Sequence, residues 1–171
     1  VVQISAVAST VPVAGSSGNN VYLPGDEREL FNIADQYNYS EGAAEVFGIK
    51  FLEGREAVAA NEVAVSRKFV EKMQEFADWS DGAIGKGIVL TEHSQTKDDI
   101  FTICGVYEDY KMGAVYVDER PSIRFGAVRG DKNLYLSGVA IKMYELTPAS
   151  IASVQKVVDE MLPDRGVEVI A

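Results

Sequence analysis

The sequence predicts a mixed α+β fold, and three observations lead to this prediction. The hydrophobic fraction of 47% and the charged fraction of 25% in 171 residues are typical of one folded domain, or of two small lobes sharing a core. The chain from 134 to 170 has the pattern strand, helix, strand, as in a βαβ or split βαβ unit. The middle carries short strand and helix patterns. Together they predict that the βαβ-like ends pack around an inserted, strand-rich middle.

The N-terminal part is predicted to form strands, a loop and one short helix. Alternating patterns at 2–9 and 30–39 indicate strands, and the glycine, serine and asparagine content of 14–20 indicates a flexible loop. Residues 42–47 fit a short helix that Gly48 would end in the C′ position. Gly54 and Arg55 are predicted to turn the chain.

The middle part is predicted to alternate strands with one helix. Residues 62–65 fit a strand, after which Ser66 would cap a helix reaching Phe76. A glycine-rich turn at 82–87 precedes strands at 88–90 and 100–106, which a polar hairpin loop at 93–99 would connect.

The C-terminal part is predicted to contain the longest helix. A strand at 134–144 is followed by Thr147 as N-cap and Pro148 in the first turn, and the helix would reach Leu162. Pro163 and Gly166 would end it, and 167–170 would return as a strand. The predicted buried stripe consists of Ile151, Val154, Val158, Met161 and Leu162.

Charge and composition exclude several classes of function. The net charge of −10 opposes binding to phosphate backbones and to anionic lipid headgroups, so no nucleic-acid partner is predicted. A single cysteine excludes an internal disulfide and a site with several thiolates. No apolar run approaches the roughly 18 residues of a membrane helix, and no signal peptide or initiator methionine is present. The start within a strand pattern suggests a piece of a longer polypeptide.

The candidate catalytic residues are weak. His93, with Ser94 beside it, is expected in a solvated hairpin tip, and a metal site would need Glu92 or Asp98 to converge on it. Cys104 lies in an apolar strand pattern and is expected to be a small buried residue, because no histidine or lysine is placed to activate it as a nucleophile.

Two further patterns fail as functional motifs. The segment 82–87 has two residues between its first glycines, whereas a phosphate loop has four and then a hydroxyl residue after Gly-Lys. The adjacent acidic pairs fit a solvated surface, and the tyrosines at 107, 110 and 116 fit half-buried strand positions or the wall of a groove. We therefore predict no catalytic, cofactor-binding or metal-binding residue.

Four segments, in order, resemble the MacB-like periplasmic core domain of ABC-transporter permeases in the MacB/FtsX family. They are YSEGAAEVFGIKFLEGR at 39–55, NEVAVSRKF at 61–69, AIGKGI at 83–88 and FTICGVYEDY at 101–110. Ala83 stands where this family commonly has proline, and the strand and helix that normally open its porter lobe are not evident before Val2.

The resemblance implies a fold, a role and a location. Residues 1–29 and 121–171 would form a porter-like βαβ lobe, and 30–120 an inserted β-rich lobe with short helices. Such a domain is not catalytic and lies at the periplasmic face of the bacterial inner membrane. It transmits ATP-driven motion to substrate efflux, lipoprotein release or signalling. Its partners would be the membrane helices of the same permease, a cytoplasmic ATPase subunit, a periplasmic adaptor, peptide or lipoprotein, and a second copy in the full-length protein.

Two alternatives stay open at this point. The chain could be a periplasmic ligand-binding or sensory module, with a pocket between the loop at 14–20 and the tyrosines at 107–116. An enzyme would have to use His93 with Glu92, or Cys104.

The segment 48–55 is expected to be structural. Ile49, Phe51 and Leu52 are predicted to point into the inserted lobe. Arg55 is expected to pair with a carboxylate that fixes the turn, with presentation of its charge to a partner as the alternative.

Overall fold

The computed structural model describes residues 1–7, 18–33, 35–91, 94, 96, 99–110, 118–126 and 138–169. It confirms the predicted α+β class. The strands are β1 (Gln3–Val7), β2 (Asn19–Tyr22), β3 (Phe31–Ile33), β4 (Asp35–Tyr39), β5 (Phe51–Gly54), β6 (Glu62–Ser66), β7 (Gly87–Leu90), β8 (Phe101–Tyr107), β9 (Ser122–Gly126) and β10 (Gly138–Lys142). The helices are α1 (Ala43–Phe47), α2 (Arg67–Met73) and α3 (Pro148–Met161).

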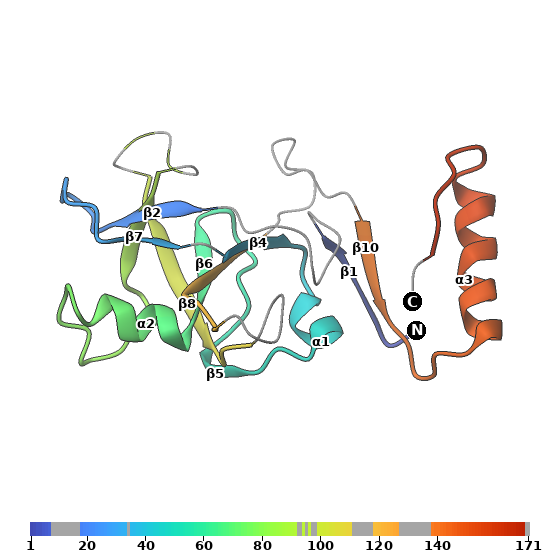
Figure 1. The fold of residues 1–171 in the computed structure, drawn as a ribbon, viewed down its shortest axis with the longest axis horizontal. Coiled ribbons are helices and arrows are strands. Elements are labelled where there is room, and N and C mark those ends of the chain that lie inside the picture. Colours follow the sequence, from blue (N-terminus) through green and yellow to red (C-terminus); the bar gives the residue numbers. More distant parts are fainter. Residues whose placement is uncertain are drawn as a thin grey trace.

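The strands of the described residues form one curled sheet in the order β10-β1-β4-β9-β6-β8-β7-β2-β3, with β5 paired to β8. The β4–β9 and β6–β8 pairs are parallel and the others antiparallel. Figure 1 shows β2, β7, β8 and α2 at one end of the long axis, β1, β10 and α3 at the other, and β4 and α1 between them. Sequence order therefore differs strongly from spatial order.

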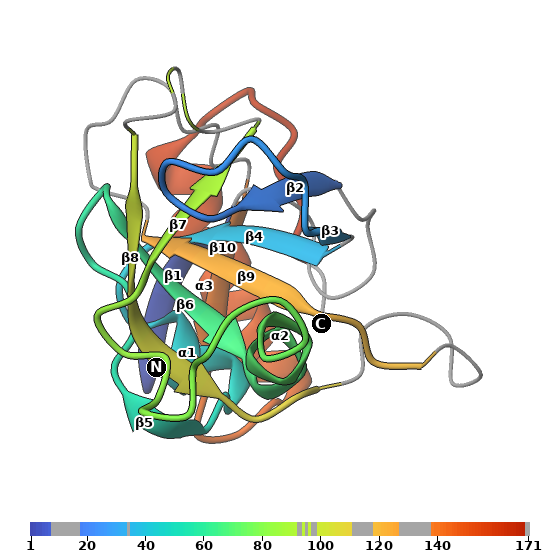
Figure 2. The same cartoon turned by 90° about the vertical axis from the view of Figure 1, so that its left-hand side faces the viewer.

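The larger of two apolar clusters fills the part of the sheet that carries α2. Its fully buried members include Val63, Phe69, Met73 and Ile103. Figure 2 shows α2 end-on beside β6 and β9. We call this part, made of β2, β3, β6–β9 and α2, the distal body. The smaller cluster consists of Val7, Tyr37, Tyr39 and Ala43, with Phe47, Tyr110 and Ala140 packed against it.

The predicted helix signals of α1 and α2 are confirmed. Gly48 ends α1 with a positive φ of 67°. Ser66 caps α2 by accepting a hydrogen bond from the Phe69 amide at 3.2 Å, and it also accepts one from the Ser122 amide of β9 at 3.0 Å. Asp109 adds a second cap by accepting from the Lys68 amide at 2.9 Å. The helix ends at Met73, before the predicted Phe76.

The start of α3 is predicted correctly, but the predicted burial of one of its faces is wrong. Thr147 and Ser150 form a reciprocal capping box, followed by Pro148 in the first turn. None of the residues in α3 is buried, so the predicted buried stripe is wrong, and Met161 is 74% exposed. Figure 1 shows the chain that follows α3 passing between this helix and β10, which separates the helix from the sheet.

Three other local predictions are corrected by long-range pairing. Asn19 and Asn20, expected in the loop at 14–20, belong to β2, while 14–17 lie outside the described residues. The single strand expected at 30–39 is two strands, because β3 pairs with β2 and β4 pairs with β9. Residues 167–169 form no strand, since the Gln155 side chain bonds the carbonyl of Val167 and the amide of Val169. Ile170 lies outside the described residues.

The described part of the chain contains no helix that is both long and apolar enough to cross a bilayer.

Candidate functional site

A buried arginine connects the two apolar clusters. Arg124 lies in β9, whose residues are all buried, and its own exposed fraction is 3%. Its guanidinium lies over the ring of Tyr39 at 4.4 Å and is 5.9 Å from the ring of Tyr107. It also contacts the hydroxyl of Tyr110 at 3.5 Å. Arg124 therefore contacts residues of the smaller cluster from a strand of the distal body.

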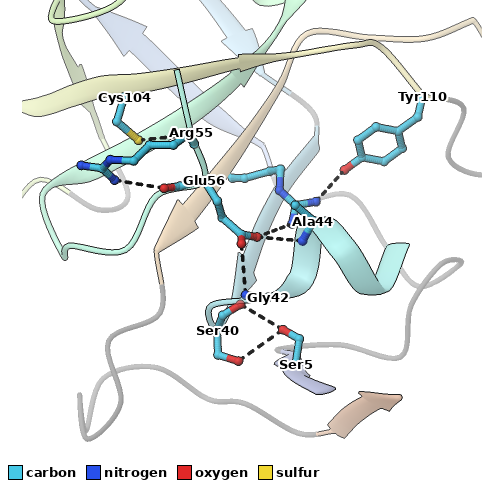
Figure 3. A network of polar contacts seen from close by, with 9 residues as sticks. Ser5, Ser40, Gly42, Ala44, Arg55, Glu56, Cys104 and Tyr110 are labelled. Carbon is cyan, nitrogen blue, oxygen red and sulfur yellow. Dashed lines mark hydrogen bonds and ion pairs between the residues drawn. The ribbon is translucent and has the colours of Figure 1, made fainter. Parts of the chain in front are cut away.

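Glu56 pairs with this arginine and caps α1. The carboxylate of Glu56 is 3.4 Å from Nη2 of Arg124, and it accepts hydrogen bonds from the amides of Gly42 at 3.1 Å and Ala44 at 2.9 Å. Gly42 has no side chain with which to cap the helix, so a carboxylate from another loop satisfies these amides. Figure 3 shows Glu56 between the start of α1 and the strands of the body.

The contacts of Arg124 and Glu56 favour a structural role over a catalytic one. Burial is the main cause that raises the pKa values of Tyr37, Tyr39, Tyr107 and Tyr110 above the usual range for tyrosine, so all four stay neutral at pH 7. Nε of Arg124 is buried without a hydrogen-bond partner among the described residues. Burying the charge of Arg124 with an incomplete set of hydrogen bonds costs stability. Such a charge is useful where it fixes one arrangement of its neighbours.

Arg55 forms the carboxylate pair that the sequence predicts. Its guanidinium donates two hydrogen bonds to the carboxylate of Glu62, one of them at 2.8 Å. Glu62 also accepts from the amides of Val58 at 3.3 Å and Ala59 at 3.2 Å. The hydrogen bond from Arg55 is the main cause that lowers the pKa of Glu62 to about 2. This pair fixes the loop between β5 and β6, which also carries Glu56.

The apolar residues predicted beside Arg55 are only partly buried. Ile49 and Phe51 are of intermediate exposure, and Leu52 is 48% exposed, so its predicted inward orientation is wrong. The reason lies in the pairing of β5, which among the described strands is bonded to β8 alone, and which has a register shift between Phe51 and Glu53. Gly105 of β8 lies directly against this segment, since the carbonyl of Arg55 and the ring of Phe51 occupy the space that a Cβ on Gly105 would need.

Cys104 is a candidate reactive residue within the described part of the chain. The Cys104 thiol lies near the carbonyls of Arg55 and Val63, and burial is the first cause that raises its pKa above the usual range. This agrees with a structural cysteine. His93, Glu92 and Asp98 lie outside the described residues. Within the part that is described, no three His, Cys, Asp or Glu residues could together hold a metal ion.

Tyr107, which the ligand-binding hypothesis places in the wall of a pocket, lies in the core. Tyr107 is fully buried, and its hydroxyl pairs with the Ser122 hydroxyl at 2.8 Å. Tyr116 lies outside the described residues. The segment 82–87 forms a turn into β7, with Lys86 paired to Asp81 at 2.7 Å instead of being free to bind phosphate.

Sequence reasoning missed Glu56, Arg124 and the strand that carries Arg124. The available signal was the position of an arginine between Ile123 and Phe125, because a charge inside an apolar strand pattern needs a buried partner. The partner could not be identified from spacing, since Glu56 and Arg124 are 68 positions apart.

Comparison by sequence gives no assignment: no protein-family model and no curated protein matches the chain. Comparison of folds does find relatives. A domain of a protein described as a permease from Porphyromonas gingivalis superposes with a TM-score of 0.61 at 16% identity, over 96% of this chain and 71% of that one. The extracellular domain of the noncanonic ABC-type transporter YknZ from Gram-positive bacteria gives a TM-score of 0.62 at 13% identity, over 100% and 82%. At such identities the likeness establishes a shared fold.

Proposed function

We propose that the chain is an extracytoplasmic domain of an ABC-type permease and that it is not itself an enzyme. The observation that carries the proposal is the likeness, over 100% of the chain, to the extracellular domain of an ABC-type transporter. A second neighbour supports it, since that domain comes from a protein described as a permease. Fold alone does not imply function, so the proposal depends on both neighbours being described as parts of membrane transport proteins.

More specifically, we propose a permease of the MacB/FtsX family, because four motifs that resemble this family occur in order between residues 39 and 110. ATP would be hydrolysed by a cytoplasmic ATPase subunit, and the permease's own membrane helices would move the domain. The domain would transmit this motion to efflux, lipoprotein release or signalling, with a periplasmic adaptor, a peptide or a lipoprotein as partner. The full-length protein would form a homodimer. Its place would be the periplasmic face of the inner membrane.

The division into lobes at 1–29 with 121–171 and at 30–120 is also a proposal. Under it, the lobe formed by the chain ends contains β1, β2, β9 and β10, and three of these strands pair with the inserted lobe: β1 with β4, β2 with β3 and β7, and β9 with β4 and β6.

The complete gene provides the test. Its product is expected to carry membrane helices beside this domain, and a tagged full-length protein extracted in detergent is expected to co-purify with an ATPase subunit. A reading frame without membrane helices, or a full-length protein that purifies without any ATPase, would refute the proposal.

A further inference from the structure

We propose that the free edge of β10 binds an extended peptide that carries apolar side chains at alternate positions and lysine or arginine between them. The segment 167–169, which follows α3, is placed to cover the other edge of the bound peptide. This binding property belongs to the chain itself, whereas the origin of the peptide in a transport partner rests on the function proposed above.

Strand β10 lies at an edge of the sheet and lacks the usual protections against pairing with a further strand. It pairs along five positions with β1 and, among the described strands, with no other. Its ladder has no bulge, its sequence has no proline, and its single charge is Lys142 at the end. A regular edge with unpaired amides and carbonyls is a template for another strand. The opposite edge, β3, is only three residues long.

The face of this edge that points away from α1 is apolar. Ile4 lies directly opposite Ile141 in the ladder, so their side chains share a face, and Val139 lies on the same face two positions along. Val139 is 63% exposed and Ile4 is 49% exposed. A strand added beside β10 would extend this face with every second side chain, so it needs apolar residues at alternate positions.

The segment 167–169 presents a second unpaired backbone edge. The Gln155 side chain of α3 donates to the carbonyl of Val167 and accepts from the amide of Val169, both at 2.9 Å, as a neighbouring strand would. Alternate residues of an extended segment bond to opposite sides, so the amide and carbonyl of Glu168 point away from Gln155. Figure 1 shows this segment between α3 and β10, which turns that edge towards β10. No backbone hydrogen bond of Glu168 is found within the described ranges.

Helix α3 and the segment that follows it can adjust to a bound strand. None of the residues in α3 is buried. The side-chain hydrogen bonds that the structure describes for this helix all stay between residues 145 and 169. A part held by so few contacts with the sheet can shift at little cost in free energy.

Charge complementarity favours a basic peptide over a second copy of the chain. The net charge of −10 opposes the pairing of two copies. Glu168 is exposed and stands between Val167 and Val169, so its carboxylate lies on the face opposite to their side chains. Lys142 already donates to the carbonyl of Glu45 in α1. A lysine or arginine of the bound strand opposite Glu168 would form a favourable cross-strand pair.

Nuclear magnetic resonance of the isotope-labelled, purified chain tests the proposal. The probe is a capped hexapeptide that alternates lysine and valine. We expect the amide signals of 138–142 and 167–169 to shift as the peptide is added. A hexapeptide that alternates glutamate and valine is the matched control, and we expect it to bind at least about fivefold more weakly. No shift at 138–142, or equal binding of the two peptides, would overturn the inference.

Two charge reversals test the role of Glu168 at positions that the fold tolerates. Glu168→Lys is expected to weaken binding of the lysine–valine peptide about fivefold. The matched control is Glu160→Lys, because Glu160 is exposed on α3 and only 3.9 Å from Lys156, and it should leave the affinity unchanged. Val139→Lys, which places a charge on the apolar face of β10, should also weaken binding. Equal weakening by Glu160→Lys and Glu168→Lys would contradict the proposed contact.

Two further measurements exclude other occupants of the edge. Signals of 138–142 that shift with protein concentration in the absence of peptide would reveal a second copy there and overturn the inference. In the complete permease, the β10 amides that do not bond to β1 are expected to exchange rapidly with deuterated solvent. Their protection without added peptide would show that the permease's own polypeptide covers the edge, which would also overturn it. Absence of an ATPase partner would refute the permease assignment and leave the peptide-binding result valid.

Discussion

Replacing Glu62 by glutamine is expected to destabilise the fold in a pH-dependent way. Glu62 accepts two hydrogen bonds from Arg55 and two from the amides of Val58 and Ala59. Glutamine keeps the length of the side chain but loses the charge and part of the acceptor capacity. The loop between β5 and β6 would then lose its main polar anchor.

The size of the effect follows from the lowered pKa. A fall in the pKa from 4.5 to about 2 corresponds to about 3.5 kcal/mol, at ~1.4 kcal/mol per pKa unit. Because the side chain of Arg55 is 55% exposed, solvent screening reduces this, and we expect about 1–2 kcal/mol at pH 7. The folded pKa lies below the unfolded one. The stabilisation is therefore complete above about pH 5 and disappears as the pH falls towards 2.

Urea unfolding followed by fluorescence of the single tryptophan, the buried Trp79, measures the difference. The gap in unfolding free energy between the unsubstituted chain and Glu62→Gln should be full at pH 7 and clearly smaller at pH 3. The control is Glu71→Gln, whose partner Arg67 is 3.7 Å away on an exposed helix face, and it should change stability by less than about 0.5 kcal/mol. A gap that does not change with pH, or no gap at pH 7, would refute the argument.

Four further substitutions test the packing. Phe69→Ala, at a fully buried position, should lower the free energy of urea unfolding by about 3–5 kcal/mol. Leu52→Ala, at a 48% exposed position, should lower it by less than about 1 kcal/mol. Equal costs for the two substitutions would contradict the burial pattern. Gly105→Ala would place its Cβ against the Arg55 carbonyl, so β5 should detach from β8 and its amides should exchange faster with deuterated solvent; unchanged exchange would argue against this close contact. Ser66→Ala removes an acceptor for two amides and should cost about 1–2 kcal/mol, seen as a lower thermal midpoint; an unchanged midpoint would contradict this role of the hydroxyl.

Sequence alone was sufficient where the cause is local. Gly48 ends α1, Ser66 begins α2 and Thr147 begins α3, because each acts on backbone groups within a few positions of itself. The carboxylate pairing of Arg55 was predictable for the same reason, since its partner Glu62 is seven positions away. The α+β class followed from the spacing of apolar residues, which sets the type of each element.

Tertiary structure decided everything that depends on distant partners. The pairing of Asp35 with Ser122 in the parallel β4–β9 ladder, and of Glu56 with Arg124, brings together residues that no local pattern relates. Periodicity predicts which face of α3 is apolar but not whether the fold covers it, and in this structure that face is not buried. The capping of α1 belongs to this second kind of feature, because the carboxylate that accepts from the amides of Gly42 and Ala44 is that of Glu56 in another loop.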